Sequence, residues 1–519
     1  MDRHAQLHDA PAIGAFARAF VAAAVVVAFV ERWWFPYAWR ETTSLTSVFY
    51  YGDATRFVAY ARAIAQGRVY DNGIPFHPPG WPLLLAGLFH ATGATGGPVP
   101  VSAIKLLTAA LGALTVGAAA LLAGEVAGSG ALIAAAVLLA FDFGHIVEST
   151  VANSEALYGL LVTLAAAAAW RWLRDAATPP RAWAALAGVL AGAASLVRAE
   201  FLAAAVVWGA WAWMRRRARV DLLLYAAAMA LVLTPTTIWH WRTLSAFNAA
   251  HVGRVAGPLP RFAPVTSYGP FNFAMANHED ADGVPNRDHP MLDRCQGDTS
   301  AALEAGQLDL ACPAAYDLYV HGYEIGALWL LNNPGAALRL VGRKLAFTVG
   351  CLGQGFFVDD LAVGVDGVRR RVDLVDPANW WLIPIRLALL IVGLVALKRR
   401  PAALAVVGGP LVALVASAVL FYGYVRLGVA YLPVAYVLIG AGAAWVAQRA
   451  TGRFATRRTM AAALLTMALV LVYERTARDA DRRLLVDGPR LADGTLNQDE
   501  TVEIRRSTER GEPLRLGRP

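Results

Sequence analysis

The run PVSAIKLLTAALGALTVGAAALLA, from Pro100 to Ala123, decides the fold class of this chain. It carries a single charged residue, Lys105, and at about 1.5 Å per residue it is long enough to cross the hydrocarbon layer of a membrane as a helix. Small residues recur along it, which suits close packing against other helices in lipid. The run therefore predicts a membrane span.

Apolar runs of this kind recur along the whole chain. Of the 519 residues, 57% are hydrophobic and 16% are charged, a composition that soluble domains of ordinary size cannot bury. We therefore predict an all-α polytopic membrane protein with about eleven transmembrane helices. The first run has no small-residue cleavage site after it, so it is taken as a retained span. The expected spans are Pro11–Val30, Pro100–Ala123, Gly130–Ile146, Ala152–Trp172, Ala182–Val197, Phe201–Met214, Val220–Trp239, Trp380–Leu397, Ala402–Leu420, Val429–Val446 and Thr459–Leu471.

Clusters of arginine and lysine predict the orientation. The net charge of +8 does not indicate a nucleic-acid partner, because the basic residues gather at the ends of apolar runs, where they favour the cytoplasmic side and contact membrane lipids. An even number of expected spans separates each of four clusters from the next, so all four belong in the cytoplasm. We therefore expect a multi-pass protein of the inner (plasma) membrane with a cytoplasmic N-terminus and an extracytoplasmic C-terminus. The clusters are Arg171–Arg181, Arg215–Arg219, Lys398–Arg400 and Arg449–Arg458.

This topology divides the chain into four regions. Residues 1–240 form an N-terminal transmembrane module with a first outer loop at 31–99, residues 241–379 an extracytoplasmic loop region, residues 380–474 the C-terminal transmembrane helices, and residues 475–519 a polar tail. The short apolar piece Trp81–Phe89 and the amphipathic segment Asn333–Cys351 are expected to be juxtamembrane elements at the outer face.

The extracytoplasmic loop region is rich in Pro, Gly, Asn and Asp and is expected to form a small irregular cap. Cys295 and Cys312 both lie in it, and an exported compartment is oxidising, so a disulfide between them is predicted. Two unpaired cysteines are the alternative.

The first outer loop holds three candidate functional residues. It reads YYGDATRFVAYARAIAQGRVYDNGIPFHPPGW, from Tyr50 to Trp81. Asp53 precedes a helical pattern in which Arg56 follows one turn later, and a helix cap is the structural alternative to a functional role. His77 precedes two prolines that fix an extended backbone, and it either caps a turn or binds a phosphate.

Further acids and bases lie near the outer ends of later spans. Glu155 begins an otherwise apolar helix, where an ionisable side chain is costly unless it is paired or faces a wet cavity. Arg198 lies in the turn after the fifth span, with Glu200 as a possible ion-pair partner, and Arg426 lies in a late outer segment. A guanidinium group matches the geometry of phosphate oxygens. Such a face suits a substrate with a phosphate head and an apolar tail.

These residues belong to motifs with a family resemblance. The segments GDATRFVAYARAIAQG, HPPGWPLLLAGLF, ANSEALYGLL, GVLAGAASLVRAEFL and VRLGVAYLPVAYVL together resemble the C-type (GT-C) superfamily of integral membrane glycosyltransferases. The closest pattern is that of its protein O-mannosyltransferase and lipid A aminoarabinose transferase group. The resemblance covers Val21–Leu244 well and Trp380–Val446 more loosely.

The resemblance implies a cell-envelope hexosyl- or pentosyltransferase. Such an enzyme transfers a sugar from a polyprenyl-phosphate-linked donor to a hydroxyl of a lipid, glycan or protein acceptor on the extracytoplasmic face, with inversion at the sugar. Asp53 matches the catalytic Asp of the first outer loop and would act as general base. Glu155 matches a second acidic position, and the resemblance implies that both carboxylates are catalytic. Arg56, His77 and Arg198 match basic positions, and with Arg426 they are the expected contacts of the donor phosphate.

Two questions stay open on the sequence alone. Many relatives have a second acid where Ala54 follows Asp53, so no cofactor is certain, although a divalent metal is not ruled out. A transporter or lipid flippase without transferase activity is the alternative function. The cytoplasmic halves of the expected spans disfavour this alternative. They are nearly all Ala, Val and Leu, so they offer no polar path through both leaflets.

Overall fold

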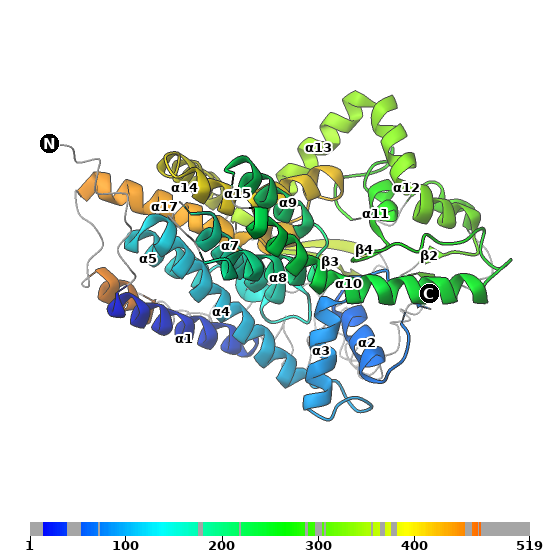
Figure 1. Ribbon diagram of the computed structural model, residues 1–519, viewed down its shortest axis with the longest axis horizontal. Coiled ribbons are helices and arrows are strands. Elements are labelled where there is room, and N and C mark those ends of the chain that lie inside the picture. The colour runs from blue at the N-terminus through cyan, green and yellow to red at the C-terminus, as the bar shows by residue number, and fades with distance from the viewer. Residues whose placement is uncertain are drawn as a thin grey trace, which may run out of the picture.

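The computed structural model is predominantly helical, with two short antiparallel hairpins (Figure 1). The hairpins pair β1 (Glu304–Ala305) with β2 (Leu308–Asp309) and β3 (Phe356–Val363) with β4 (Arg369–Leu374). The structure describes residues 14–38, 53–70, 73–174, 180–216, 219–285, 289–295, 304–305, 308–353, 356–363, 369–374, 381–451, 459–465 and 467–468.

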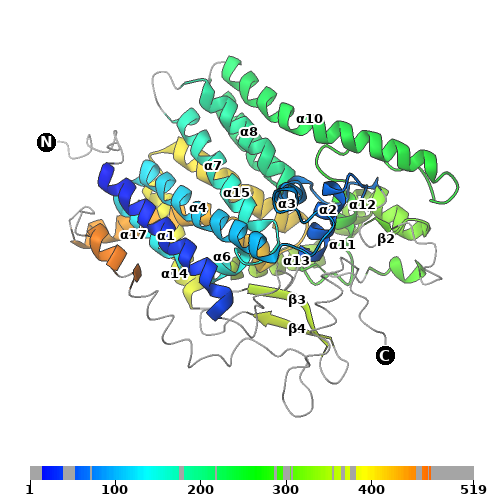
Figure 2. The ribbon, with the colours of Figure 1, turned by 90° about the horizontal axis from the view of Figure 1, so that it is seen from below.

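The N-terminal half forms a row of long helices. Each helix packs on the next in the order α1, α4, α7, α8 and α10, and Figure 2 shows them running side by side. Glycine permits the closest of these approaches: a Cβ atom added at Gly188 would lie 2.2 Å from the backbone oxygen of Tyr225. The row consists of α1 (Ala15–Ala38), α4 (Val101–Ala127), α7 (Glu155–Leu173), α8 (Ala182–Val197) and α10 (Arg219–Ala250).

The C-terminal helices complete the bundle. Among them, α17 (Leu432–Thr451) is buried at every position from Leu432 to Gly442, because it packs against α4, α5 and α14. The other C-terminal helices of the bundle are α14 (Leu382–Ala396) and α15 (Pro401–Leu420). From the N-terminal half, α5 (Ser129–Ala140) packs against α17 and α9 (Phe201–Met214) packs against α15.

Several helices are suited to a membrane. In the described part of the chain, α4, α7, α10 and α15 are long and apolar enough to cross it, and α3 (Gly80–Ala91), α5, α8, α9 and α14 are shorter apolar helices. This is a multi-pass membrane protein, whereas the number of eleven spans stays a prediction. The expected bounds Ala182–Val197 and Phe201–Met214 agree with α8 and α9.

Two expected spans are interrupted in the structure. The run Gly130–Ile146 was expected to be one helix, but α5 ends at Ala140 and α6 (Phe143–Glu148) begins after Asp142. The break occurs because the Asp142 carboxylate accepts the backbone N–H of His145 at 3.0 Å and so caps a new helix. The expected span Val429–Val446 is likewise interrupted near its start, because α16 (Val425–Val429) ends at Val429 and α17 begins only at Leu432.

The region after Trp239 is more helical than expected. Helix α10 continues to Ala250 instead of ending at Trp239. The irregular cap is not confirmed, because the described residues after α10 include α11 (Gly269–Met275), α12 (Pro313–Asn332) and α13 (Pro334–Val349) as well as segments outside helices. Helix α13 matches the predicted amphipathic segment, and α12 and α13 project as a splayed hairpin (Figure 1). The predicted disulfide is confirmed, with an S–S distance of 2.05 Å between Cys295 and Cys312.

Other predictions fall partly or wholly outside the described residues. The polar tail 475–519 and the basic segment 452–458 lie there, as do Tyr50 and the residues that lead to Asp53. The last expected span, Thr459–Leu471, is helical at its described positions, 459–465 and 467–468.

Candidate functional site

The candidate site lies where α2 (Ala54–Ala65) and α16 meet the first turn of α7 and the turn between α8 and α9. Asp53 directly precedes α2, yet its side chain makes no capping hydrogen bond with that helix. Its Oδ2 atom instead accepts from Nη1 and Nη2 of Arg426, each at 3.3 Å. The helix-cap interpretation of Asp53 is therefore not supported.

Arg426 joins Asp53 to a series of alternating acids and bases. Its Nε atom donates to Oε1 of Glu155 at 2.6 Å, and the same oxygen accepts from Nη1 of Arg198 at 2.8 Å. Arg198 in turn donates through Nε to Glu200 at 2.5 Å. The order Asp53, Arg426, Glu155, Arg198, Glu200 is called the ion-pair series below.

The members of the ion-pair series differ in exposure. The Glu155 side chain is 1% exposed and those of Arg426 and Arg198 are 11% and 12% exposed, whereas Asp53 keeps 43% of its side-chain surface exposed. The second oxygen of Glu155, Oε2, is buried and has no hydrogen-bond partner among the described residues. Asp53 is thus the end of the series that a substrate can reach, and Glu155 is its buried centre.

The charges around Asp53 favour its ionised form. Burial acts to raise the pKa of Asp53, but Arg426, His77 in its protonated form and Arg56 outweigh it, so the pKa lies below its ordinary value of 3.8. The Asp53 side chain is partly exposed, so burial raises its pKa less than these charges lower it. Arg56 lies in the first turn of α2, and its charge also acts on His77.

His77 lies in an aromatic pocket beside the series. Its Nδ1 atom and the hydroxyl of Tyr60 are hydrogen-bonded at 3.2 Å, and its ring lies 5.8 Å from that of Phe57 and 6.0 Å from that of Tyr268. Burial lowers the pKa of His77 to about 4, although the nearby Asp53 opposes this shift. At neutral pH His77 is therefore uncharged, and it can offer a hydrogen bond to an anion but not a positive charge.

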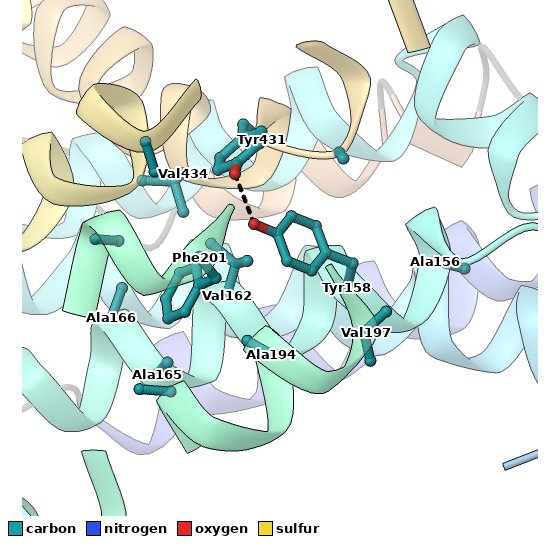
Figure 3. Packing of buried hydrophobic residues seen from close by; sticks show 14 of the residues in the cluster. Ala156, Tyr158, Val162, Ala165, Ala166, Ala194, Val197, Phe201, Tyr431 and Val434 are labelled. Atoms are coloured by element: carbon teal, nitrogen blue, oxygen red, sulfur yellow. Dashed lines mark hydrogen bonds between the residues drawn. The ribbon is translucent and has the colours of Figure 1, made fainter. Parts of the chain in front are cut away.

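Two buried tyrosines pack beside Arg198. The hydroxyl groups of Tyr158 and Tyr431 are hydrogen-bonded at 2.6 Å, surrounded by apolar side chains such as Val162 and Phe201 (Figure 3). The guanidinium carbon of Arg198 lies 5.6 Å from the ring centre of Tyr158, within reach of a cation–π contact. The contact with the Tyr158 ring helps to hold the Arg198 guanidinium in position.

The structure brings together four of the six candidate residues by direct contact: Asp53, Glu155, Arg198 and Arg426. Arg56 and His77 lie beside them and act through charge and packing. The sequence did not identify Tyr424, whose hydroxyl accepts from Nη2 of Arg198 at 3.2 Å. The only signal for it is its place two positions before Arg426.

The site residues do not fit a divalent cation. The guanidinium of Arg426 fills the space between Asp53 and Glu155, the two carboxylates that would be the natural ligands. Within the described ranges no group of three or more His, Cys, Asp or Glu side chains is placed to hold a metal ion. A bound cation would have to displace Arg426.

Comparison with known families supports the resemblance found in the sequence. Residues 86–249 match the family described as dolichyl-phosphate-mannose-protein mannosyltransferase. This range contains Glu155, Arg198 and Glu200 but neither Asp53 nor Arg426. No curated protein sequence matches the chain.

Solved structures similar to this chain include two membrane glycosyltransferases. The oligosaccharyltransferase AglB from Archaeoglobus fulgidus, in complex with an inhibitory peptide and a dolichol-phosphate, gives a TM-score of 0.47 at 15% identity over 96% of this chain and 59% of its own. ArnT from Cupriavidus metallidurans, bound to undecaprenyl phosphate, gives 0.34 at 15% identity over 84% and 78%. The chain thus spans little more than half the length of the oligosaccharyltransferase.

Proposed function

We propose that this chain is a membrane glycosyltransferase that transfers a sugar from a polyprenyl-phosphate-linked donor to an acceptor hydroxyl on the extracytoplasmic face of the inner membrane. The observation that carries the proposal is the ion-pair series, which holds two arginines beside one accessible carboxylate, Asp53. The match of residues 86–249 to the protein mannosyltransferase family supports the reaction class.

Asp53 acts as the general base. Its lowered pKa keeps the carboxylate ionised at neutral pH, so it can accept the proton of the acceptor hydroxyl as that oxygen attacks the anomeric carbon. The bond from the anomeric carbon to the phosphate oxygen breaks, and its electron pair passes to the lipid phosphate. Attack from the face opposite the leaving group inverts the configuration of the sugar.

Arg426 and Arg198 stabilise the charge that develops on the leaving phosphate. Both side chains are largely buried, where a guanidinium acts on an anion more strongly than in water. Arg56 adds positive charge at the mouth of the site, and the neutral His77 donates one hydrogen bond.

Glu155 positions the two arginines. Its Oε1 atom accepts from both guanidinium groups, and its side chain is too buried to meet the acceptor. We therefore assign to Glu155 the holding of Arg198 and Arg426 in a fixed geometry, and to Asp53 the proton transfer.

The test is transfer of radiolabelled sugar from a short-chain polyprenyl-phosphate mannose in membranes that contain the chain. Asp53→Asn is expected to abolish transfer while the purified variant elutes from size exclusion like the wild type. Arg339→Gln, an exposed arginine on α13, is the matched control and should keep full activity. Full turnover by Asp53→Asn would remove Asp53 from the mechanism.

A second measurement addresses the choice of sugar. Lipids, glycans and exported proteins are compared by mass spectrometry in cells with and without the chain. The proposal predicts a sugar modification that disappears with the chain and with Asp53→Asn. Identical profiles in all three strains would contradict it.

A further inference from the structure

An apolar groove of about 600 Å³ lies between α9 and α10. Helix α10 packs closely on α8 but makes few contacts with α9, which leaves the groove open. A Cβ atom added at Gly209 would meet only the Tyr225 ring, at 3.9 Å. The residues that line the groove include Ala205, Gly209 and Trp213 on α9 and Leu222, Ala226 and Met229 on α10.

The described residues that form the floor of the groove offer no free polar group. The ring of Tyr225 stacks on that of Trp172 at 4.9 Å, and its hydroxyl donates to the backbone oxygen of Ala205 at 3.0 Å. The polar atom of Tyr225 is therefore already satisfied, and the surface that faces the groove is hydrocarbon. Such a surface suits an alkyl chain and gives nothing to a polar ligand.

One end of the groove is strongly basic. Arg219 lines it, and Arg215 and Arg216 are exposed in the turn that joins α9 to α10. The nearest acid on α10, Asp221, is buried and pairs with Arg181 at 3.7 Å. This is the end of the bundle that the distribution of basic residues assigns to the cytoplasm.

The apolar rim beside these arginines is exposed. Trp213 is 68% exposed and Leu223 is 67% exposed, which in a membrane protein places them against lipid. The hydrocarbon walls of the groove suit the acyl chain of a phospholipid, and the arginines at one end suit its headgroup phosphate. The aromatic rim lies where membrane proteins place aromatic residues, at the interface.

We propose that this groove binds a phospholipid with an anionic headgroup from the leaflet at the arginine end. One acyl chain lies between α9 and α10, and the phosphate contacts Arg219. The site does not depend on the proposed transferase activity. A lipid in the groove would nonetheless contact α9, which begins at Phe201, directly after Glu200 of the ion-pair series.

Native mass spectrometry of the full chain tests the proposal. The protein is released from nanodiscs that contain equal amounts of phosphatidylglycerol and phosphatidylcholine. The wild type is expected to retain phosphatidylglycerol in preference to phosphatidylcholine. Arg219→Gln is expected to lower that retention about fivefold, the effect of one arginine near a phosphate.

A groove-filling variant separates the apolar contact from the charge. Gly209→Leu places a side chain in the groove and is expected to abolish retention of both lipids, with Ala226→Met as the milder substitute if Gly209→Leu does not fold. Arg399→Gln, an exposed arginine of another basic cluster, should retain phosphatidylglycerol like the wild type. Equal retention of the two lipids by the wild type, or unchanged retention in the folded groove-filling variant, would overturn the proposal.

Discussion

Arg426 donates two hydrogen bonds to a single oxygen of Asp53, at 3.3 Å each, across 373 positions of sequence. Both distances are long for charged groups, whereas Arg426 holds Glu155 at 2.6 Å. The guanidinium is therefore anchored by Glu155 and only loosely engaged by Asp53. A phosphate that enters the site competes with the weaker of these two contacts.

Replacement of Arg426 tests its part in charge stabilisation. Arg426→Gln is expected to lower kcat at least a hundredfold, about 3 kcal/mol, because a buried donor to the leaving phosphate is lost. Initial rates at saturating donor measure the effect, with Arg339→Gln as the matched control. A variant that changes only KM would assign Arg426 to donor binding rather than to the transition state.

The pH profile reports the charge around Asp53. Burial acts to raise its pKa and the nearby positive charges lower it further than burial raises it, so the base stays ionised and kcat/KM should be level from about pH 5 to 8 as far as Asp53 and His77 are concerned. In Arg426→Gln the opposing charge is lost, the pKa of Asp53 rises, and the acidic limb moves to higher pH. An acidic limb that stays in place would show that another group controls it.

Removal of divalent cations should leave transfer intact. Arg426 already fills the position between Asp53 and Glu155 where a cation would bind. Rates in excess EDTA and in added Mg²⁺ or Mn²⁺ are expected to agree within about twofold, an effect well under 1 kcal/mol. Activity that EDTA abolishes and Mn²⁺ restores would show that Arg426 moves aside for a metal.

Glu155 and Glu200 should differ in their effect on stability, although both accept from Arg198. Glu155→Gln removes the shared acceptor of two buried arginines, and the loss of one partner in a buried ion pair costs about 3 kcal/mol or more. Glu200 is more exposed, and among the described residues it forms its ion pair with Arg198, so Glu200→Gln should cost less. Thermal unfolding of the two purified variants compares them, and equal losses would contradict a central role for Glu155.

The Cys295–Cys312 disulfide should stabilise the start of α12. It closes a loop with a sequence separation of 17, and such a cross-link contributes about 3 kcal/mol in the chain-entropy account. Cys312→Ser, or reduction of the wild type, is expected to lower the Tm. Thiol titration of the unreduced, denatured protein should find one free thiol, that of Cys351, and a count of three would exclude the bridge.

The sequence predicted the helices best where an apolar run has sharp charged ends. Helices α8 and α9 have their expected bounds because arginines flank both of them. The break at Asp142 was missed because one acid in a long apolar run does not reveal that it caps a new helix. Helix α12 was missed because tyrosine, histidine and glycine interrupt its apolar pattern.

The site was predictable as a set of residues but not as an arrangement. Asp53, Glu155, Arg198 and Arg426 could be placed at one face, because each lies near the outer end of an expected span. That Arg426 bridges the two acids depends on how α16 packs, 271 positions after Glu155. The neutral state of His77 likewise depends on burial among Phe57, Tyr60 and Tyr268, which no local pattern encodes.

The long separation between the members of the ion-pair series has a consequence for the order in which the protein is made. Asp53, Glu155 and Arg198 leave the ribosome well before Arg426, so the two carboxylates meet their shared guanidinium only after most of the chain has been synthesised. A polypeptide that stops before α16 would carry the base and its buried neighbour without the residue that joins them. The proposed mechanism therefore requires that synthesis proceed through α16 before the ion-pair series can form.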